Sequence, residues 1–370
     1  MTKKGRYQQQ KVKKTGLGKK IVLSVFLLLL FLVVGAVTAG GLYYNSMLNL
    51  VTRPETVTSE NILSDDQLKE ILGYVPEKID FDGQNSTSSF SVENKDQKEK
   101  KDKDDSVVNI MLIGQQAREK EVAKLSDTMI LCSINKETKT ITLTSFLRDL
   151  YVKLPDFQGH ICGKNRINVA YNLGWYWAGE KGGMEMLDQL ILENFGVEID
   201  YNVEVGFDAF KSVIDTLGGV DMELTADEAR HIQVGNGAGT YHLDGESALN
   251  YARTRHSNAG DNDFYRTNRQ RKLITNLLNK CRSMNITELH NILKEILPLV
   301  ITDMTNEEIT QCALELLPML VDLKIVSNQV PAEGTYWFDM IDIIGVESSV
   351  IICDLEKNSE LLAQIAEPVH

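Results

Sequence analysis

The segment from Ile21 to Leu42 places the strongest constraint on how this chain can fold, because none of its 22 residues is charged. A helix rises 1.5 Å per residue, so the segment would be about 33 Å long, enough to cross a bilayer. It is longer than the apolar part of a secretory signal, which has about 7–15 residues. We therefore predict an uncleaved transmembrane helix at residues 21–43. A signal cleaved near Ala36–Ala39 and a buried soluble helix are the alternatives.

The residues before this segment predict its orientation. The first twenty residues contain no acidic residue and eight basic ones, namely Lys3, Lys4, Arg6, Lys11, Lys13, Lys14, Lys19 and Lys20. Basic flanks stay on the cytoplasmic side of a membrane, where they also contact anionic lipid. Residues 1–20 are thus expected to be a cytoplasmic tail. The chain would be a single-pass protein of the cell membrane, with its body on the outer side.

The body of the chain is acidic. The net charge is −13, and without the eight basic residues of the tail 31 basic residues remain against 52 acidic ones. Such a surface repels a polyanion, so no nucleic-acid partner is expected. The five cysteines form neither a CxxC pair nor a Cys/His metal pattern. Buried free thiols are predicted, with one disulfide as the alternative.

Two composition changes divide the body. Residues 44–105 are expected to be an extracytoplasmic stalk and linker, because DGQNSTSSFSVENKDQKEKKDKDDS is polar and nearly free of large apolar residues. Residues 106–370 are expected to be the folded domain. Apolar runs at 107–114, 128–135, 140–146, 220–224, 326–330 and 348–355 predict strands, and helical spacing predicts helices at 184–196, 207–217, 246–254, 266–281, 285–297 and 306–320. This alternation indicates an α/β fold, an α/β/α sandwich around a central twisted mixed sheet.

Five arginines are crowded into ALNYARTRHSNAGDNDFYRTNRQRK, namely Arg253, Arg255, Arg266, Arg269 and Arg271. On a helix Arg253 and Arg255 would lie about 200° apart, so they can converge only if the chain leaves the helix between them. Positions 266, 269 and 270 share one helical face. Guanidinium groups near a helix start suit a pyrophosphate. The alternative is a solvated basic face paired with the chain's many acids.

A second group of polar residues follows the first predicted strands. Arg118 and Asp127 lie between the first two strands, and Arg148 and Asp149 directly follow the strand at 140–146. Lys164, Arg166 and Asn168 come next in KNRINVAYNLG. Ligands of open α/β sheets bind at the carboxyl ends of strands, so these residues are candidates for the same site.

Taken in order, the motifs SDTMI, SFLRDLYV, RINVAYNLG, DAFKSVIDTLGGV, LDGESALNYARTR and DNDFYRTNRQ resemble those of the LytR-CpsA-Psr family, over roughly residues 107–357. Members are cell-envelope phosphotransferases of mainly Gram-positive bacteria. The resemblance implies that a glycopolymer, a teichoic acid or a polysaccharide, is moved from polyprenyl pyrophosphate onto a peptidoglycan hydroxyl as a phosphodiester. Polyprenyl phosphate would be released, and the lipid would lie in an apolar tunnel between sheet and helices.

The resemblance also implies roles for single residues. A pyrophosphate clamp would be formed by Arg118, Arg148, Arg253, Arg255 and Arg266. Asp127 would hold Mg²⁺, Asp263 and Gln270 would complete the polar surroundings, and either Asp263 or Asp149 would orient a hydroxyl or an arginine. The residues expected to bind the remainder of the substrate are Lys164, Arg166, Asn168 and Arg269.

Gln116 stands where the family has a magnesium-binding aspartate. A neutral amide is a poorer ligand for Mg²⁺ than a carboxylate. Three consequences are open: Asp127, phosphates and waters hold the metal, or binding is weak, or the chain is a catalytically impaired, regulatory relative. A lipid pyrophosphatase is a further alternative, and transcriptional regulation is disfavoured by the predicted anchor. Leu147 replaces a usual proline and Arg166 a usual lysine, and neither change removes a charge.

Overall fold

The computed structural model describes residues 46–55, 69, 77–78, 106–115, 126–255, 263–281, 284, 286–316, 322–343, 345 and 347–366. The predicted tail and anchor, and the site candidates Gln116 and Arg118, lie outside these residues. Within the described part of the chain, no helix combines the length and apolar character that a membrane span requires.

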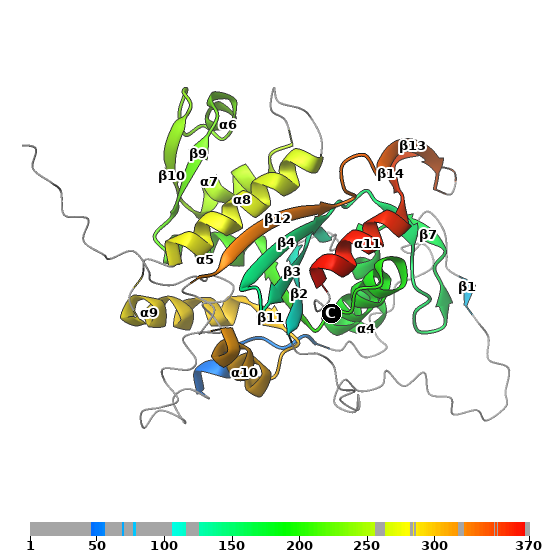
Figure 1. The fold of residues 1–370 in the computed structure, drawn as a ribbon, viewed down its shortest axis with the longest axis horizontal. Coiled ribbons are helices and arrows are strands. Elements are labelled where there is room, and N and C mark those ends of the chain that lie inside the picture. The colour runs from blue at the N-terminus through cyan, green and yellow to red at the C-terminus, as the bar shows by residue number, and fades with distance from the viewer. Residues whose placement is uncertain are drawn as a thin grey trace, which may run out of the picture.

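A six-stranded mixed sheet forms the centre of the molecule, with the strand order β11-β8-β2-β3-β4-β12 (Figure 1). Its strands are β2 (Val107–Gln115), β3 (Ser126–Asn135), β4 (Thr140–Phe146), β8 (Tyr201–Gly206), β11 (Ile301–Thr302) and β12 (Lys324–Val330). β2 runs parallel to β8 and β4 runs parallel to β12, whereas β3 is antiparallel to both of its neighbours. The strands predicted at 107–114, 128–135, 140–146 and 326–330 are confirmed, and so is the α/β class with a mixed central sheet.

Both faces of this sheet are buried, which explains why its central strands are continuous apolar runs. Ile110 and Leu112 belong to the core on one face, and Met111 and Ile113 belong to the core on the other. This alternation follows from the two-residue period of a strand. Each face therefore has its own layer of helices.

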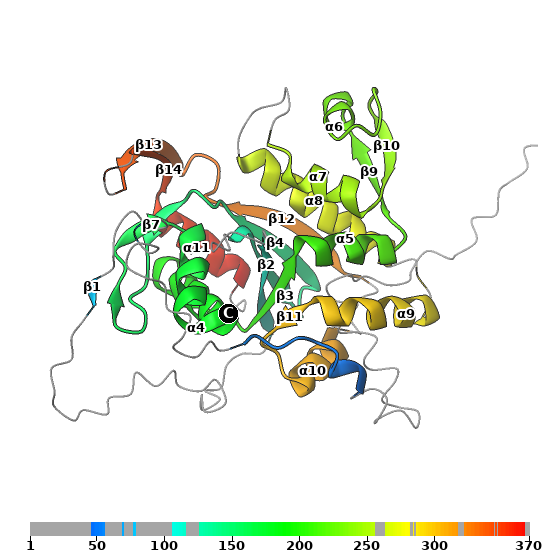
Figure 2. The ribbon, with the colours of Figure 1, turned by 180° about the vertical axis from the view of Figure 1, so that it is seen from behind.

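One face is covered by α4 (Asn168–Phe195) and α11 (Leu355–Ala366), which contact each other. The other face is covered by α5 (Phe207–Thr216), α7 (Gly245–Arg253), α8 (Asp263–Cys281) and α9 (Ile286–Ile296), as the two opposite views show (Figures 1 and 2). α10 (Asn306–Leu316) and η3 (Leu297–Leu299) adjoin this second layer. The predicted sandwich is thus present, with helices near all six predicted positions.

Smaller elements surround the sandwich. The strand predicted at 220–224 is β9 (Val220–Leu224), but it pairs with β10 (Gly239–Leu243) outside the central sheet. The strand predicted at 348–355 is β14 (Glu347–Cys353), which pairs with β13 (Tyr336–Asp342). Two further strand pairs are β5 (Tyr151–Lys153) with β7 (Lys164–Arg166), and β1 (Glu77–Lys78) with β6 (His160–Ile161). The short helix α6 (Ala226–His231) follows β9.

The packed unit begins earlier than residue 106. Met47, Leu48 and Val51 are buried in the core beside α9 and α10, and Thr52 forms a parallel bridge with Ile301 of β11. These residues fall in the segment that the sequence assigned to a stalk. The thiol prediction is confirmed for four cysteines, because Cys132, Cys162, Cys312 and Cys353 are free and buried.

Candidate functional site

Chain direction gathers the polar candidates at one edge of the sheet. β2, β4, β8 and β12 all end at this edge, and the antiparallel β3 begins there. Asp127 therefore lies at the start of β3, and Arg148 and Asp149 follow the end of β4. α8 begins nearby with Asp263, and its amino-terminal dipole end adds positive potential.

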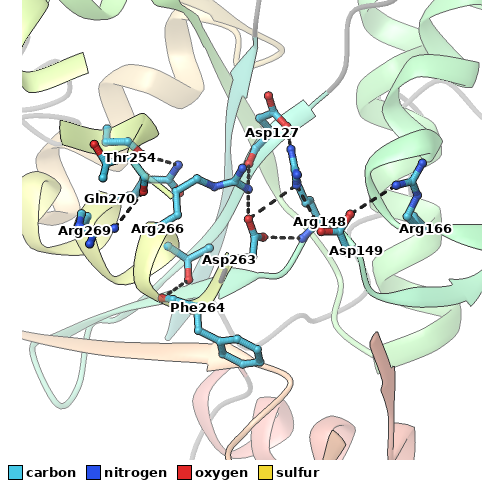
Figure 3. Close-up of polar contacts among 12 residues, drawn as sticks. Asp127, Arg148, Asp149, Arg166, Thr254, Asp263, Phe264, Arg266, Arg269 and Gln270 are labelled. Atoms are coloured by element: carbon cyan, nitrogen blue, oxygen red, sulfur yellow. Dashed lines mark hydrogen bonds and ion pairs between the residues drawn. The ribbon is translucent and has the colours of Figure 1, made fainter. Parts of the chain in front are cut away.

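Three arginines and three aspartates alternate in an ion-pair network at this edge (Figure 3). Arg148 is central: Nη1 donates to Asp127 Oδ1 at 2.8 Å, and Nε lies 3.5 Å from Asp149 Oδ2 and 3.6 Å from Asp263 Oδ1. Arg266 Nη2 lies 2.7 Å from Asp263 Oδ1 and donates to the backbone oxygen of Asp127 at 3.0 Å. The outer member is Arg166, whose Nη1 is 3.6 Å from Asp149 Oδ1.

Burial and neighbouring charges shift the pKa values of this network in opposite directions. Burial alone would lower the pKa of Arg148, but the three surrounding aspartates raise it above the usual value. Burial raises the pKa of the Asp263 carboxyl, although Arg266 and Arg148 oppose that shift. Asp263 is thus a desolvated carboxyl beside two cations, and its raised pKa makes it a candidate proton acceptor.

Arg253 and Arg255 add positive charge that the described carboxylates do not balance. α7 ends at Arg253, and Thr254 is extended (φ −59°, ψ 124°), so the chain leaves the helix between the two arginines as expected. Both arginines are exposed and line the same cavity, and the guanidinium of Arg253 lies 4.8 Å from the ring centroid of Phe207. Five arginines face three aspartates here, an excess that an anionic group would neutralise.

An apolar cavity of about 360 Å³ opens at this cluster. Its polar end contains Asp127, Arg253, Arg255, Arg266 and Gln270. Its walls come from the sheet and from the second helix layer, and they include Ile110, Leu112, Ile130, Val203, Val205, Phe207, Phe210, Val213, Leu249, Leu273, Ile274, Leu277, Ile296, Val300, Met304 and Ile309. A cavity with this lining suits an amphiphile that has an apolar tail and an anionic head.

A second cavity of about 450 Å³ adjoins the first. Arg148, Asp149, Arg166 and Asp263 line it, and Arg255 lines both cavities. The ion pairs Arg148–Asp127 and Arg266–Asp263 join residues of the two linings, so the network separates an apolar cavity from a polar one.

The described residues fit a magnesium ion only together with a phosphate. No group of three or more His, Cys, Asp or Glu side chains in the described ranges is arranged to hold a metal. Asp127 is the predicted ligand, and its Oδ1 already accepts a hydrogen bond from Arg148. Mg²⁺ is often held by one or two carboxylates plus phosphate oxygens and water, and this donor set is compatible with that mode.

The structure does not bring every candidate to the cluster. The guanidinium of Arg269 is buried and lines neither cavity: its Nε donates to Glu228 at 3.0 Å and its Nη1 to the backbone oxygen of Thr254 at 2.9 Å. Asn168 is buried at the start of α4, and its backbone N–H donates to the carbonyl oxygen of Arg148 at 3.4 Å, but the residue lines neither cavity. Lys164 is exposed on β7 and lines neither cavity. Arg118 lies outside the described residues.

Sequence reasoning also overlooked several residues of the second cavity, namely Phe264, Phe338, Ser348, Ser349, Val350 and Ile351. One signal was available for Phe338. In TYWFDM, Tyr336, Phe338 and Met340 alternate with a period of two, which places three large apolar side chains on one face of a strand.

Fold and site together define an α/β protein in which cationic side chains gather at the mouth of an apolar cavity. The comparisons make the family explicit: the pattern that defines the LytR_cpsA_psr family matches residues 78–351, and the chain belongs to this family.

Two curated relatives carry functional names. The polyisoprenyl-teichoic acid–peptidoglycan teichoic acid transferase TagU of Oceanobacillus iheyensis is 32% identical over 211 residues, which are 56% of this chain and 62% of the relative. The corresponding transferase TagT of Bacillus subtilis is 27% identical over 63% of this chain and 71% of the relative. The crystal structure of B. subtilis TagV superposes with a TM-score of 0.53 at 25% identity, covering 70% of this chain and 97% of that structure.

Proposed function

We propose that this protein transfers a glycopolymer from a polyprenyl pyrophosphate to a hydroxyl of peptidoglycan, forming a phosphodiester and releasing polyprenyl phosphate. The observation that carries the proposal is the apolar cavity whose mouth holds Arg253, Arg255 and Arg266. Its lining suits a prenyl tail, and its mouth suits the pyrophosphate. The names of the relatives TagU and TagT support the same assignment.

In the proposed reaction the acceptor oxygen attacks the phosphorus next to the glycan. A bond forms between that oxygen and phosphorus, the pyrophosphate bridge breaks, and its electron pair leaves with polyprenyl phosphate. The hydroxyl proton passes to Asp263 or to Asp149, the two carboxylates that line the second cavity. Of these, Asp263 is the better candidate because burial raises its pKa.

The arginines would supply most of the catalytic effect. Phosphoryl transfer places charge on the non-bridging oxygens, and fixed cations stabilise it without reorganisation. Arg148 and Arg266 are already held in place by Asp127 and Asp263. Asp127, together with phosphate oxygens and water, would hold Mg²⁺, whose charge would further neutralise the phosphates.

Membrane attachment is part of the proposal. A tail at residues 1–20 and a membrane helix at 21–43 would keep the domain on the outer side, next to its lipid substrate. A cysteine introduced at Thr2 should be labelled by a membrane-impermeant thiol reagent only after lysis, and one at Gly237, an exposed position, should be labelled in intact cells. Labelling of both positions in intact cells would contradict this topology.

The transfer is tested with the full-length chain in detergent, a short polyprenyl-pyrophosphate glycan, a peptidoglycan oligomer and Mg²⁺. Mass spectrometry should detect a phosphodiester-linked adduct. Arg148→Ala should lower the rate by about 10²- to 10³-fold, as loss of one preorganised donor to a developing negative charge typically does. The matched control is Arg230→Ala, because Arg230 is exposed on α6 and pairs only locally with Asp227.

Two other results would replace the proposal. Tight lipid binding without any adduct would indicate a binding or regulatory relative, the alternative that Gln116 raises. Release of glycan phosphate without an adduct would indicate a pyrophosphatase.

A further inference from the structure

We propose that the second cavity and the aromatic face of β13 form the subsite for the acceptor glycan, with Phe338 stacking against a sugar ring. This inference rests on the proposed function and adds to it the place where the acceptor binds. The occupant is a glycan chain of peptidoglycan, not the glycopolymer of the donor.

The reaction geometry selects this cavity. In phosphoryl transfer the attacking and leaving oxygens lie roughly in line on opposite sides of phosphorus. The leaving group carries the prenyl tail, so it points into the apolar cavity. The attacking hydroxyl must then arrive from the opposite side of the ion-pair network, where the second cavity lies and Asp149 and Asp263 line it.

The lining of this cavity suits a sugar. Asp149, Arg166 and Asp263 offer charged hydrogen-bonding groups, and Ser348 and Ser349 add hydroxyl groups. Phe264 and Phe338 add aromatic rings to the same lining. A pyranose ring has polar edges and apolar faces of C–H groups, so binding it requires both kinds of surface.

The aromatic rings form a continuous row that leads away from the charged network. Phe264, directly after Asp263 on α8, stacks on Tyr336 with 4.7 Å between ring centroids. Tyr336 meets Phe338 edge to face at 5.8 Å. Phe338 is 58% exposed, although it is a large apolar residue. A row of rings beside a reaction centre can hold successive sugars of a glycan chain.

The backbone ties this row to the reacting segment. The N–H of Ile351 on β14 donates to the carbonyl oxygen of Asp149 at 2.9 Å, and Ile351 is the cross-strand partner of Phe338. The position of Phe338 is therefore fixed relative to Arg148 and Asp149. A glycan held by these aromatic rings would therefore place its attacking hydroxyl next to the ion-pair network.

The strand also supplies a matched control. Trp337 is adjacent to Phe338, is 54% exposed, and points to the opposite face of β13, and it lines neither cavity. Phe338→Ala and Trp337→Ala thus remove similar exposed aromatic area from one strand. Because both side chains are exposed, neither change should impair folding.

The test is a steady-state transfer assay with the full-length chain, in which donor and acceptor concentrations are varied separately. The acceptor is a tetrasaccharide of alternating N-acetylglucosamine and N-acetylmuramic acid. Phe338→Ala should raise the acceptor KM by about 3- to 10-fold, the range expected for loss of one aromatic contact. The donor KM should stay unchanged, Phe338→Tyr should restore the acceptor KM, and Trp337→Ala should behave as the parent protein does.

An acceptor KM that is equal in Phe338→Ala and Trp337→Ala would overturn the subsite while leaving the transferase proposal intact. A raised donor KM in Phe338→Ala would assign the row to the donor glycan and overturn the acceptor assignment. If the parent chain shows no transfer, the proposed function fails, and saturation-transfer NMR with the tetrasaccharide tests the subsite alone. Loss of the NMR signal only in Phe338→Ala supports it, and equal signals overturn it.

Discussion

At the residue scale, the arginines of the ALNYARTRHSNAGDNDFYRTNRQRK segment differ in what their nitrogens contact. Arg253, Arg255 and Arg266 line the apolar cavity, whereas Arg269 is engaged by Glu228 and by the carbonyl oxygen of Thr254. Arg271 is buried, and its Nε and Nη1 have no hydrogen-bond partner among the described residues. Burial lowers the pKa of Arg271 to about 10. Because Arg269 contacts other groups of the protein and lines neither cavity, we assign it to the stability of the fold.

This assignment predicts the effect of Arg269→Ala. The substitution would leave the largely buried carboxylate of Glu228 without its cationic partner, with only its hydrogen bonds from Thr225 remaining, and breaking such a pair typically costs about 3–5 kcal/mol. Urea denaturation of the full-length chain should show a free energy of unfolding lowered by that amount. Arg230→Ala, at an exposed pair, should change it by less than about 1 kcal/mol. A stable but inactive Arg269→Ala protein would instead place Arg269 in substrate binding.

The raised pKa of Asp263 predicts a pH dependence. Only the deprotonated carboxylate can accept the hydroxyl proton, and a raised pKa means that this form is lost at a higher pH than for an ordinary aspartate. The kcat for transfer should therefore fall as pH decreases through that pKa. In a kcat–pH profile, Asp263→Asn should lower kcat and abolish this acidic limb, while Asp149→Asn should keep it. The reverse pattern would make Asp149 the proton acceptor.

The sequence could predict contacts that depend on local geometry. The convergence of Arg253 and Arg255 required only the helical angle per residue and a break at Thr254, and the structure has that break. The role of Arg269 was not predictable in the same way. Its partner Glu228 is 41 residues earlier in the chain, and helical spacing does not reveal which face of α8 another helix will cover.

At the scale of elements, strands with long apolar runs were predictable and short or unusual elements were not. β2, β3 and β4 are buried on both faces, which produces continuous apolar sequences. β8 has the sequence YNVEVG, whose buried and half-buried residues alternate, and its short polar pattern gave no strand signal. The prediction of a helix at 184–196 captured only the second half of α4.

The glycines of α4 explain why the first half of this helix was not predicted. Ala178 and Gly179 have non-helical backbone angles, and the two halves of the helix meet closely at Gly174 and Gly182. A Cβ added to Gly182 would lie 2.4 Å from the backbone oxygen of Gly174. A sequence with so many glycines weakens a helix prediction, although here glycine permits the close packing.

Gly182→Ala should therefore destabilise the fold. The methyl group meets backbone atoms that cannot move without shifting half of α4, and overpacking of this kind costs about 1–3 kcal/mol. Gly237→Ala is the matched control, because an added Cβ there meets nothing within 4 Å. Thermal unfolding of both variants checks this prediction. Equal melting temperatures would show that the two halves of α4 can separate without cost.

At the scale of the whole molecule, an acidic chain concentrates five arginines at one edge of its sheet. The overall charge is −13, yet Arg148, Arg166, Arg253, Arg255 and Arg266 line the two adjoining cavities. Because the molecule is otherwise acidic, this edge is expected to be the part that attracts an anionic head group. In the proposed function, the apolar cavity behind this edge would take the lipid, and the aromatic row beside it would take the sugar.

The most direct measurement of the central claim follows each phosphorus atom of the donor. Two polyprenyl-pyrophosphate glycans would be prepared, one with ³²P next to the glycan and one with ³²P next to the lipid. With the full-length chain and peptidoglycan, the first label should appear in the peptidoglycan phosphodiester and the second in polyprenyl monophosphate, in equal amounts. If the first label appeared as free glycan phosphate, or if neither label moved, the account of this site as a glycopolymer phosphotransferase would be contradicted.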